Sequence, residues 1–168
     1  MELTPLFNLI VAAVILFLVA CVYLVNLLKN WKIEIEKAAY LLYFEVTRRS
    51  DLIPRLIEVM NNDASYGPLI AARAKSMEMN SFGEEKKQAE INLWKMFDEQ
   101  FKAAKVKADR TAGVQLSALE KDWKEANKKV ESMSTQYNKV VGKYNRVAGS
   151  IVLKPLSLLV KAHKMPTF

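Results

Sequence analysis

An apolar run near the N-terminus limits what this chain can fold into. The run from Leu6 to Leu28 carries no charged side chain. A helix of that length, at about 1.5 Å per residue, crosses the roughly 30 Å hydrocarbon layer of a bilayer. Before it the one charged side chain is Glu2, whereas a cleaved signal peptide has a basic start and a shorter apolar stretch. The sequence therefore predicts a transmembrane anchor over residues 1–28.

Cys21, the only cysteine, lies inside this run and closes the tetrapeptide Leu18-Val19-Ala20-Cys21, which has the outline of a lipoprotein processing site. Residues 22–28 continue as apolar sequence, where a lipoprotein has a polar tether. A plain membrane residue is therefore preferred, and lipidation stays the alternative. One cysteine excludes an internal disulfide.

Basic residues follow the run and none precedes it, since Lys29, Lys32 and Lys37 come directly after the anchor. By the positive-inside rule, the N-terminus lies outside and the rest of the chain is cytoplasmic. The formal net charge of +7 suits either nucleic acid or an anionic membrane surface until the charges are located.

Beyond the anchor, apolar residues recur at spacings of three and four with little glycine or proline, which predicts an all-α domain over residues 29–150. The first helix continues from the membrane to about Arg49. Ser50-Asp51 is expected to cap and begin a second helix, with Pro54 in its opening turn, and Gly67-Pro68 is expected to kink it. A break over residues 80–83 precedes a third helix that begins at Glu84-Glu85.

A fourth helix is predicted after a turn at residues 111–113, because its apolar residues keep three-four spacing over more than four heptads. Two arrangements fit: the inner seam of an up-down four-helix bundle, which we favour, or an intermolecular coiled coil. The stripe consists of Leu116, Leu119, Trp123, Ala126, Val130, Met133, Tyr137, Val140, Tyr144 and Val147.

Residues 151–168 form a basic apolar tail that an even number of helices returns to the membrane. No acidic residue occurs from Ser132 to Phe168, and such a segment binds an anionic leaflet. The alternative is a short helix packed over the end of the bundle. The residues predicted to lie at the membrane surface are Lys29, Lys32, Lys154, Lys161 and Lys164.

The sequence offers no set of residues for catalysis. His163 is the only histidine, which excludes Cys/His metal sets and a Ser-His-Asp arrangement. The glycines form no phosphate loop, and acidic pairs such as Asp98-Glu99 lie among lysines as a solvated face. We therefore predict no enzyme activity, no cofactor and no metal. Because both charge signs are mixed along the third and fourth helices, nucleic acid is not a predicted partner.

Several motifs resemble the LemA family. The segment Arg48-Arg49-Ser50-Asp51-Leu52-Ile53-Pro54 is similar to that family's RRxDLIP signature, and Ala72-Arg73 is similar to its small-residue-Arg step. Tyr137-Asn138 and Tyr144-Asn145, seven residues apart, resemble its paired Tyr-Asn motif. Arg55 stands where the family usually has asparagine, so the chain resembles a divergent member.

The resemblance implies a bacterial single-span protein with a cytoplasmic four-helix domain and no established catalysis, and a magnetosome protein of that family is tied to building a membrane compartment. The expected location is a bacterial cytoplasmic (inner) or intracellular membrane. The predicted function is a membrane-anchored scaffold that organises or shapes the bilayer, with self-association as one means. The alternative is an adaptor that presents its bundle to a protease or signalling partner.

Both tyrosine-asparagine pairs are expected to act as a structural latch on neighbouring helices or on the Arg48–Pro54 turn.

Overall fold

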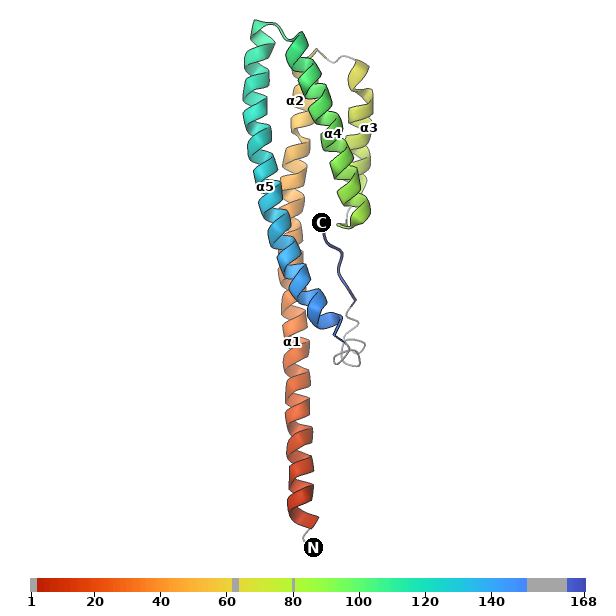
Figure 1. The fold of residues 1–168 in the computed structure, drawn as a ribbon, viewed down its shortest axis with the longest axis vertical. Coiled ribbons are helices and arrows are strands. Elements are labelled where there is room, and N and C mark those ends of the chain that lie inside the picture. The colour runs from red at the N-terminus through yellow and green to blue at the C-terminus, as the bar shows by residue number, and fades with distance from the viewer. Residues whose placement is uncertain (1–2, 62–63, 80, 151–162) are drawn as a thin grey trace. The chain divides into compact units, whose positions relative to one another are not determined.

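The computed structural model describes residues 3–61, 64–79, 81–150 and 163–168 (Figure 1). In these residues the chain is all-helical and has no strand, as predicted. Its elements are α1 (Leu3–Ser50), α2 (Leu52–Val59), a 3₁₀ turn (Ala64–Tyr66), α3 (Gly67–Glu78), α4 (Glu84–Lys107) and α5 (Arg110–Ala148). Two compact units divide the chain: one holds residues 1–36 and 140–165, the other residues 37–139 and 166–168.

The first part of α1 is apolar and unburied. None of its most apolar stretch is buried, and by length and composition α1 is long and apolar enough to cross a membrane. Phe7 and Leu16 are among its exposed side chains. Among the described residues of the same unit, the buried ones are Leu28 and Ile35 of α1 and three residues of α5, Val141, Tyr144 and Ala148.

A second helix begins at Leu52, directly after Ser50-Asp51 as predicted, but the chain does not reverse at this junction. The Asp51 amide donates to the Thr47 carbonyl at 3.1 Å, and α2 continues in the direction of α1 (Figure 1). Asp51 does precede α2, but its side chain makes no capping hydrogen bond. α2 ends at Val59, and Asn61 beyond it has a φ of 57°, because asparagine tolerates the left-handed conformation that closes helix C-termini.

Gly67-Pro68 begins a helix where a kink was expected. Pro68 lies in the first turn of α3, a position where its missing N–H had no intrahelical acceptor. The expected second helix is therefore two helices, α2 and α3, and α2 is followed by a turn at Met60 and Asn61.

The start of α4 agrees with the sequence prediction, whereas the start of α5 is displaced from it. α4 begins at Glu84 as predicted. α5 begins earlier than expected, because the Asp109 carboxylate accepts the Ala112 amide at 2.7 Å and caps it. Gly113 therefore lies inside the first turns of α5.

The core of the second unit is aromatic and aliphatic. The Phe97 and Phe101 rings of α4 lie 5.4 Å and 5.9 Å from the Trp123 ring of α5, between ring centroids. Leu56 of α2 and Leu93 of α4 are fully buried with them. These contacts give α2, α4 and α5 one shared interior.

The buried stripe of α5 follows the predicted spacing over its first half. Leu116, Leu119, Ala126, Val130 and Tyr137 are buried within one chain, as an inner seam requires. Farther along, Val141 and Ala148 are buried, whereas the predicted residues Val140 and Val147 are only half-buried. The shift by one residue follows from the mismatch between 3.6 residues per turn and a seven-residue repeat.

Candidate functional site

Three charged side chains are buried together in the second unit, and with their neutral partners we call them the Arg49 cluster. Arg49 comes from the end of α1, and Lys86 and Glu90 come from the first half of α4. Glu90 Oε2 lies 2.7 Å from Arg49 Nη2, and Glu90 Oε1 lies 3.5 Å from Lys86 Nζ. Arg49, Lys86 and Glu90 are 9%, 2% and 3% exposed, so the ion pairs are shielded from water.

Neutral side chains complete the cluster. The Ser76 hydroxyl of α3 donates to Glu90 Oε1, and Lys86 Nζ donates to the Ser76 carbonyl. The Trp94 indole donates to Glu90 Oε2 at 2.9 Å, and its ring lies 4.3 Å from the Arg49 guanidinium carbon. Arg49 Nη1 also donates to Asn127 Oδ1 of α5 at 3.2 Å. The cluster therefore joins α1, α3, α4 and α5.

Local sequence explains how α4 presents these charges inward. Its buried residues are Lys86, Glu90, Leu93, Phe97, Phe101 and Ala104, which share one helical face at three-four spacing. The charged pair thus extends the apolar stripe by two turns toward the N-terminus of α4. The Lys86–Glu90 spacing is also the one at which helical side chains of opposite charge meet.

The pKa values of the cluster record both its burial and its pairing. Burial raises the pKa of the Glu90 carboxyl, but hydrogen bonds from Ser76 and Trp94 and the charge of Arg49 outweigh it and lower the pKa below 4.5. Burial lowers the pKa values of Arg49 and Lys86, and the Glu90 charge opposes that shift. Glu90 is thus held ionised between its partners.

This arrangement suits a structural role more than a chemical one. Both Glu90 oxygens accept hydrogen bonds from cluster residues, which leaves little capacity for a substrate or an ion. Within the described residues, no group of three or more His, Cys, Asp or Glu side chains could hold a metal. A hydrogen-bonded buried ion network fixes the register of the helices that supply it.

Arg73 of α3 binds the junction between α1 and α2. Its Nε donates to the Ser50 carbonyl at 3.0 Å, and its Nη2 lies 3.2 Å from Asp51 Oδ1. Helix ends leave carbonyls without intrahelical donors, and Arg73 satisfies one of them. Leu52 and Ile53 are buried beyond the junction, whereas Pro54 is exposed.

The first Tyr-Asn pair binds the C-terminal residues. The Asn138 amide donates to the Phe168 carbonyl at 2.6 Å and accepts the Phe168 N–H at 2.9 Å, and the Tyr137 hydroxyl donates to the Pro166 carbonyl at 2.9 Å. The Phe82 ring lies 5.3 Å from the Tyr137 ring and 5.0 Å from the Phe168 ring. We call Phe82, Tyr137 and Asn138 the C-terminal clamp.

The second Tyr-Asn pair lies in the other unit and repeats the two-point bond. The Asn145 amide donates to the Met165 carbonyl and accepts the Met165 N–H, both at 2.8 Å. Tyr144 is fully buried, and burial raises the pKa of its hydroxyl. The bonds of Asn138 and Asn145 thus go to the C-terminal residues, whereas the expected partners were neighbouring helices or the Arg48–Pro54 turn.

The remaining predicted residues lie at the surface or outside the described part of the chain. Arg48 is exposed and lies 3.8 Å from Glu45 and 4.0 Å from Glu125. Lys29 and Lys164 are exposed and Lys32 is half-buried. The predicted surface residues Lys154 and Lys161 fall outside the described residues.

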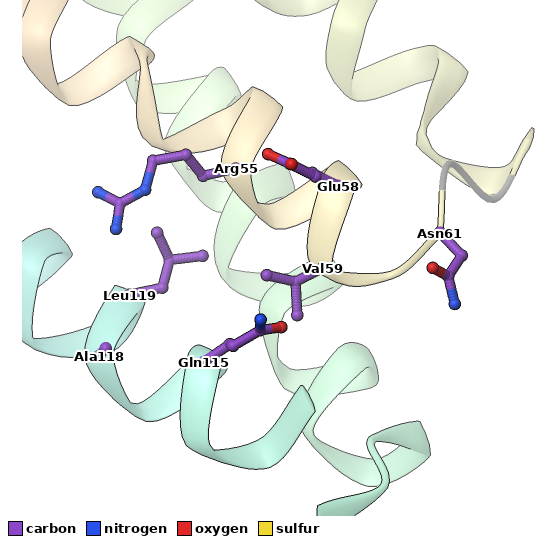
Figure 2. A pocket seen from close by; sticks show the side chains of 7 residues that line it. All are labelled: Arg55, Glu58, Val59, Asn61, Gln115, Ala118 and Leu119. Atoms are coloured by element: carbon purple, nitrogen blue, oxygen red, sulfur yellow. The ribbon is translucent and has the colours of Figure 1, made fainter. Parts of the chain in front are cut away.

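A hollow lies between the end of α2 and the start of α5 (Figure 2). Val59 and Leu119 project from the two helices into this region (Figure 2). Arg55 is already paired, since its Nη1 lies 2.8 Å from Asp122 Oδ2. The full lining is Arg55, Glu58, Val59, Asn61, Gln115, Ala118 and Leu119. One cation that is already paired and one carboxylate do not make a catalytic set.

No family model, curated protein or solved structure matches this chain. The likeness to the LemA family therefore rests on sequence motifs. The structure adds contacts to each of them: Arg49 enters the buried ion pairs, Arg73 bonds the junction, and both asparagines bond the C-terminal residues.

Sequence analysis missed Ser76, Lys86 and Glu90. A signal was present, because Lys86 and Glu90 continue the stripe of Leu93 and Phe97 at helical spacing. Charged residues that share a helical face with buried apolar residues are expected to point inward and to pair with each other. Ser76 has no comparable signal, since its role depends on how α3 packs on α4.

Proposed function

We propose that the protein is a membrane-anchored helical scaffold that organises or shapes the leaflet beside its helical domain. The observation that carries this proposal is α1, a single helix whose N-terminal part is apolar and unburied and whose C-terminal part belongs to a packed domain. A helix of this kind holds a folded domain at the bilayer surface.

The proposal extends to fold, orientation and family. Helices α1 with α2, α3, α4 and α5 would form an up-down four-helix bundle of the LemA type, with α2 as the distal end of its first helix. Lys29, Lys32 and Lys37 would place the bundle on the cytoplasmic side of a bacterial inner or intracellular membrane. Basic residues of the tail, including Lys164, would provide a second attachment to anionic lipid.

Reconstitution of the full chain into liposomes tests this function. Electron microscopy of vesicles with anionic lipid is expected to show protein arrays and altered vesicle shape, and vesicles of neutral lipid should show a weaker effect because the lysines lose their partners. Protein that is evenly dispersed on unchanged anionic vesicles would overturn the proposal.

A second candidate function is an adaptor that presents its helical domain to a protease or signalling protein. A groove between α3 and α4 supports it, and its lining includes the apolar residues Ala72, Met79 and Ala89 and the charged residues Lys75 and Glu85. Cross-linking from Gln88, which lines the same groove, would separate the two functions. A single foreign protein favours the adaptor, and contacts between copies favour the scaffold.

A further inference from the structure

The two faces of α1 beyond the membrane differ in what covers them. One face carries Ile35 and Leu42, which are 5% and 0% exposed. The opposite face carries Ile33, Tyr40 and Phe44, which are 49%, 71% and 56% exposed. Because α1 is one helix from Leu3 to Ser50, spacing alone sets these two rows about half a turn apart. Large apolar side chains thus face outward on the part of α1 that follows the anchor.

The exposed row keeps a heptad pattern. Asn30, Ile33, Lys37, Tyr40 and Phe44 follow one another at alternating spacings of three and four, the pattern of a coiled-coil seam. The same register continues back through the apolar run as Leu9, Ala12, Leu16, Val19, Tyr23 and Asn26. Other surface apolar residues, such as Val106 and Val114, continue no such row.

Charges beside the row suit a parallel copy of the same helix. In this register, Lys29 occupies a g position and Glu34 the e position five residues later, and these are the two positions that meet between parallel strands. Both side chains are exposed. Two copies would form two identical Lys29–Glu34 pairs about a twofold axis.

Polar residues in the row set the alignment. Asn30 and Lys37 occupy a positions, where one polar residue fixes register and strand number at some cost in stability. A common membrane orientation makes parallel pairing the arrangement that two anchored copies can reach. A second, parallel copy of α1 would therefore fit this face in its heptad register, in its charges and in its direction.

We propose that α1 is a parallel self-association helix, and that a second copy of the chain covers the face formed by Asn30, Ile33, Lys37, Tyr40 and Phe44. This interface rests on the membrane anchoring in the proposed function and supplies its means of self-association.

Cysteine cross-linking of the full chain in liposomes tests the face directly. In a Cys21→Ser background, Tyr40→Cys and Phe44→Cys should form disulfide-linked dimers on mild oxidation. Val114→Cys, an exposed apolar position on α5, serves as the matched control and should stay at background. Equal cross-linking at all three positions, or none at Tyr40 and Phe44, would overturn the proposal.

Charge reversal tests register and direction. Lys29→Glu or Glu34→Lys alone should weaken dimer formation, measured by energy transfer between labelled copies, by roughly two- to fivefold for each lost pair. The double reversal should restore it. Failure of that restoration, with unchanged helicity in circular dichroism, contradicts a parallel Lys29–Glu34 interface.

The two proposals fail separately. Arrays on vesicles without cross-links at Tyr40 and Phe44 would leave the scaffold function standing and remove this interface. Specific cross-links with dispersed protein on unchanged vesicles would do the opposite.

Discussion

The Arg49 cluster and the aromatic core hold α4 in place by different means. The core around Phe97 and Phe101 is apolar, and its stabilisation depends on buried area and close packing, which many arrangements of similar volume satisfy. The cluster around Lys86 and Glu90 depends on donors and acceptors that meet at set distances. We therefore expect one half of α4 to contribute mainly stability and the other to contribute mainly a unique register.

Removing the carboxylate should have the largest effect. Glu90→Ala leaves Arg49 and Lys86 buried without their counter-charge, which costs about 3–5 kcal/mol of unfolding free energy. Urea unfolding of the full chain in micelles, followed by circular dichroism, measures it. Phe97→Ala should cost a similar amount through the cavity it leaves, about 3–5 kcal/mol. Glu99→Gln, an exposed change on the same helix, is the control and should stay near wild type.

Replacing the whole cluster should have the opposite sign. With Arg49→Met, Ser76→Ala, Lys86→Leu and Glu90→Leu combined, unfolding free energy is expected to hold or to rise by about 1–4 kcal/mol, because the desolvation cost disappears. Broader side-chain signals in NMR spectra would show that the helices have lost their single register. A strongly destabilised variant would contradict the division of roles between the two halves of α4.

The C-terminal clamp should make a smaller contribution. Asn138→Ala removes both hydrogen bonds to the Phe168 backbone, and we expect about 1–2 kcal/mol of local stability to be lost. Hydrogen exchange of the Phe168 amide measures this directly and should become faster. Asn92→Ala on the exposed face of α4 is the control. Unchanged protection of Phe168 in the Asn138 variant would show that the clamp does not hold these residues.

The ionised Glu90 should make the stability of the wild type depend more steeply on pH in acid than that of a Glu90→Gln variant. Because the pKa of folded Glu90 lies below its ordinary 4.5, its contribution is complete above pH 4.5 and is lost as pH falls through the folded pKa. The urea midpoint of Glu90→Gln should therefore fall less steeply than that of wild type below pH 4.5. Parallel slopes for the two proteins would contradict the lowered pKa.

The elements that could be predicted are those set by local sequence. The long apolar helix at the N-terminus followed from an uncharged run, the start of α4 from Glu84-Glu85, and the first half of the α5 stripe from its spacing. A cap was predicted at Ser50-Asp51, but the Asp51 side chain makes no capping hydrogen bond, and Asn61 closes α2 in the left-handed conformation. The pairings across helices in the cluster and the clamp could not be derived, because each joins residues far apart in sequence, such as Arg49 with Glu90 and Asn138 with Phe168.

The burial of Lys86 has a practical consequence. Of the lysines in the described residues, it alone is classed as buried, whereas the others are exposed or half-buried. An amine-reactive label should therefore modify the surface lysines first and reach Lys86 only when α4 parts from α3. The labelling rate of Lys86, measured by mass spectrometry, would therefore report how often α4 separates from α3 in the unsubstituted protein.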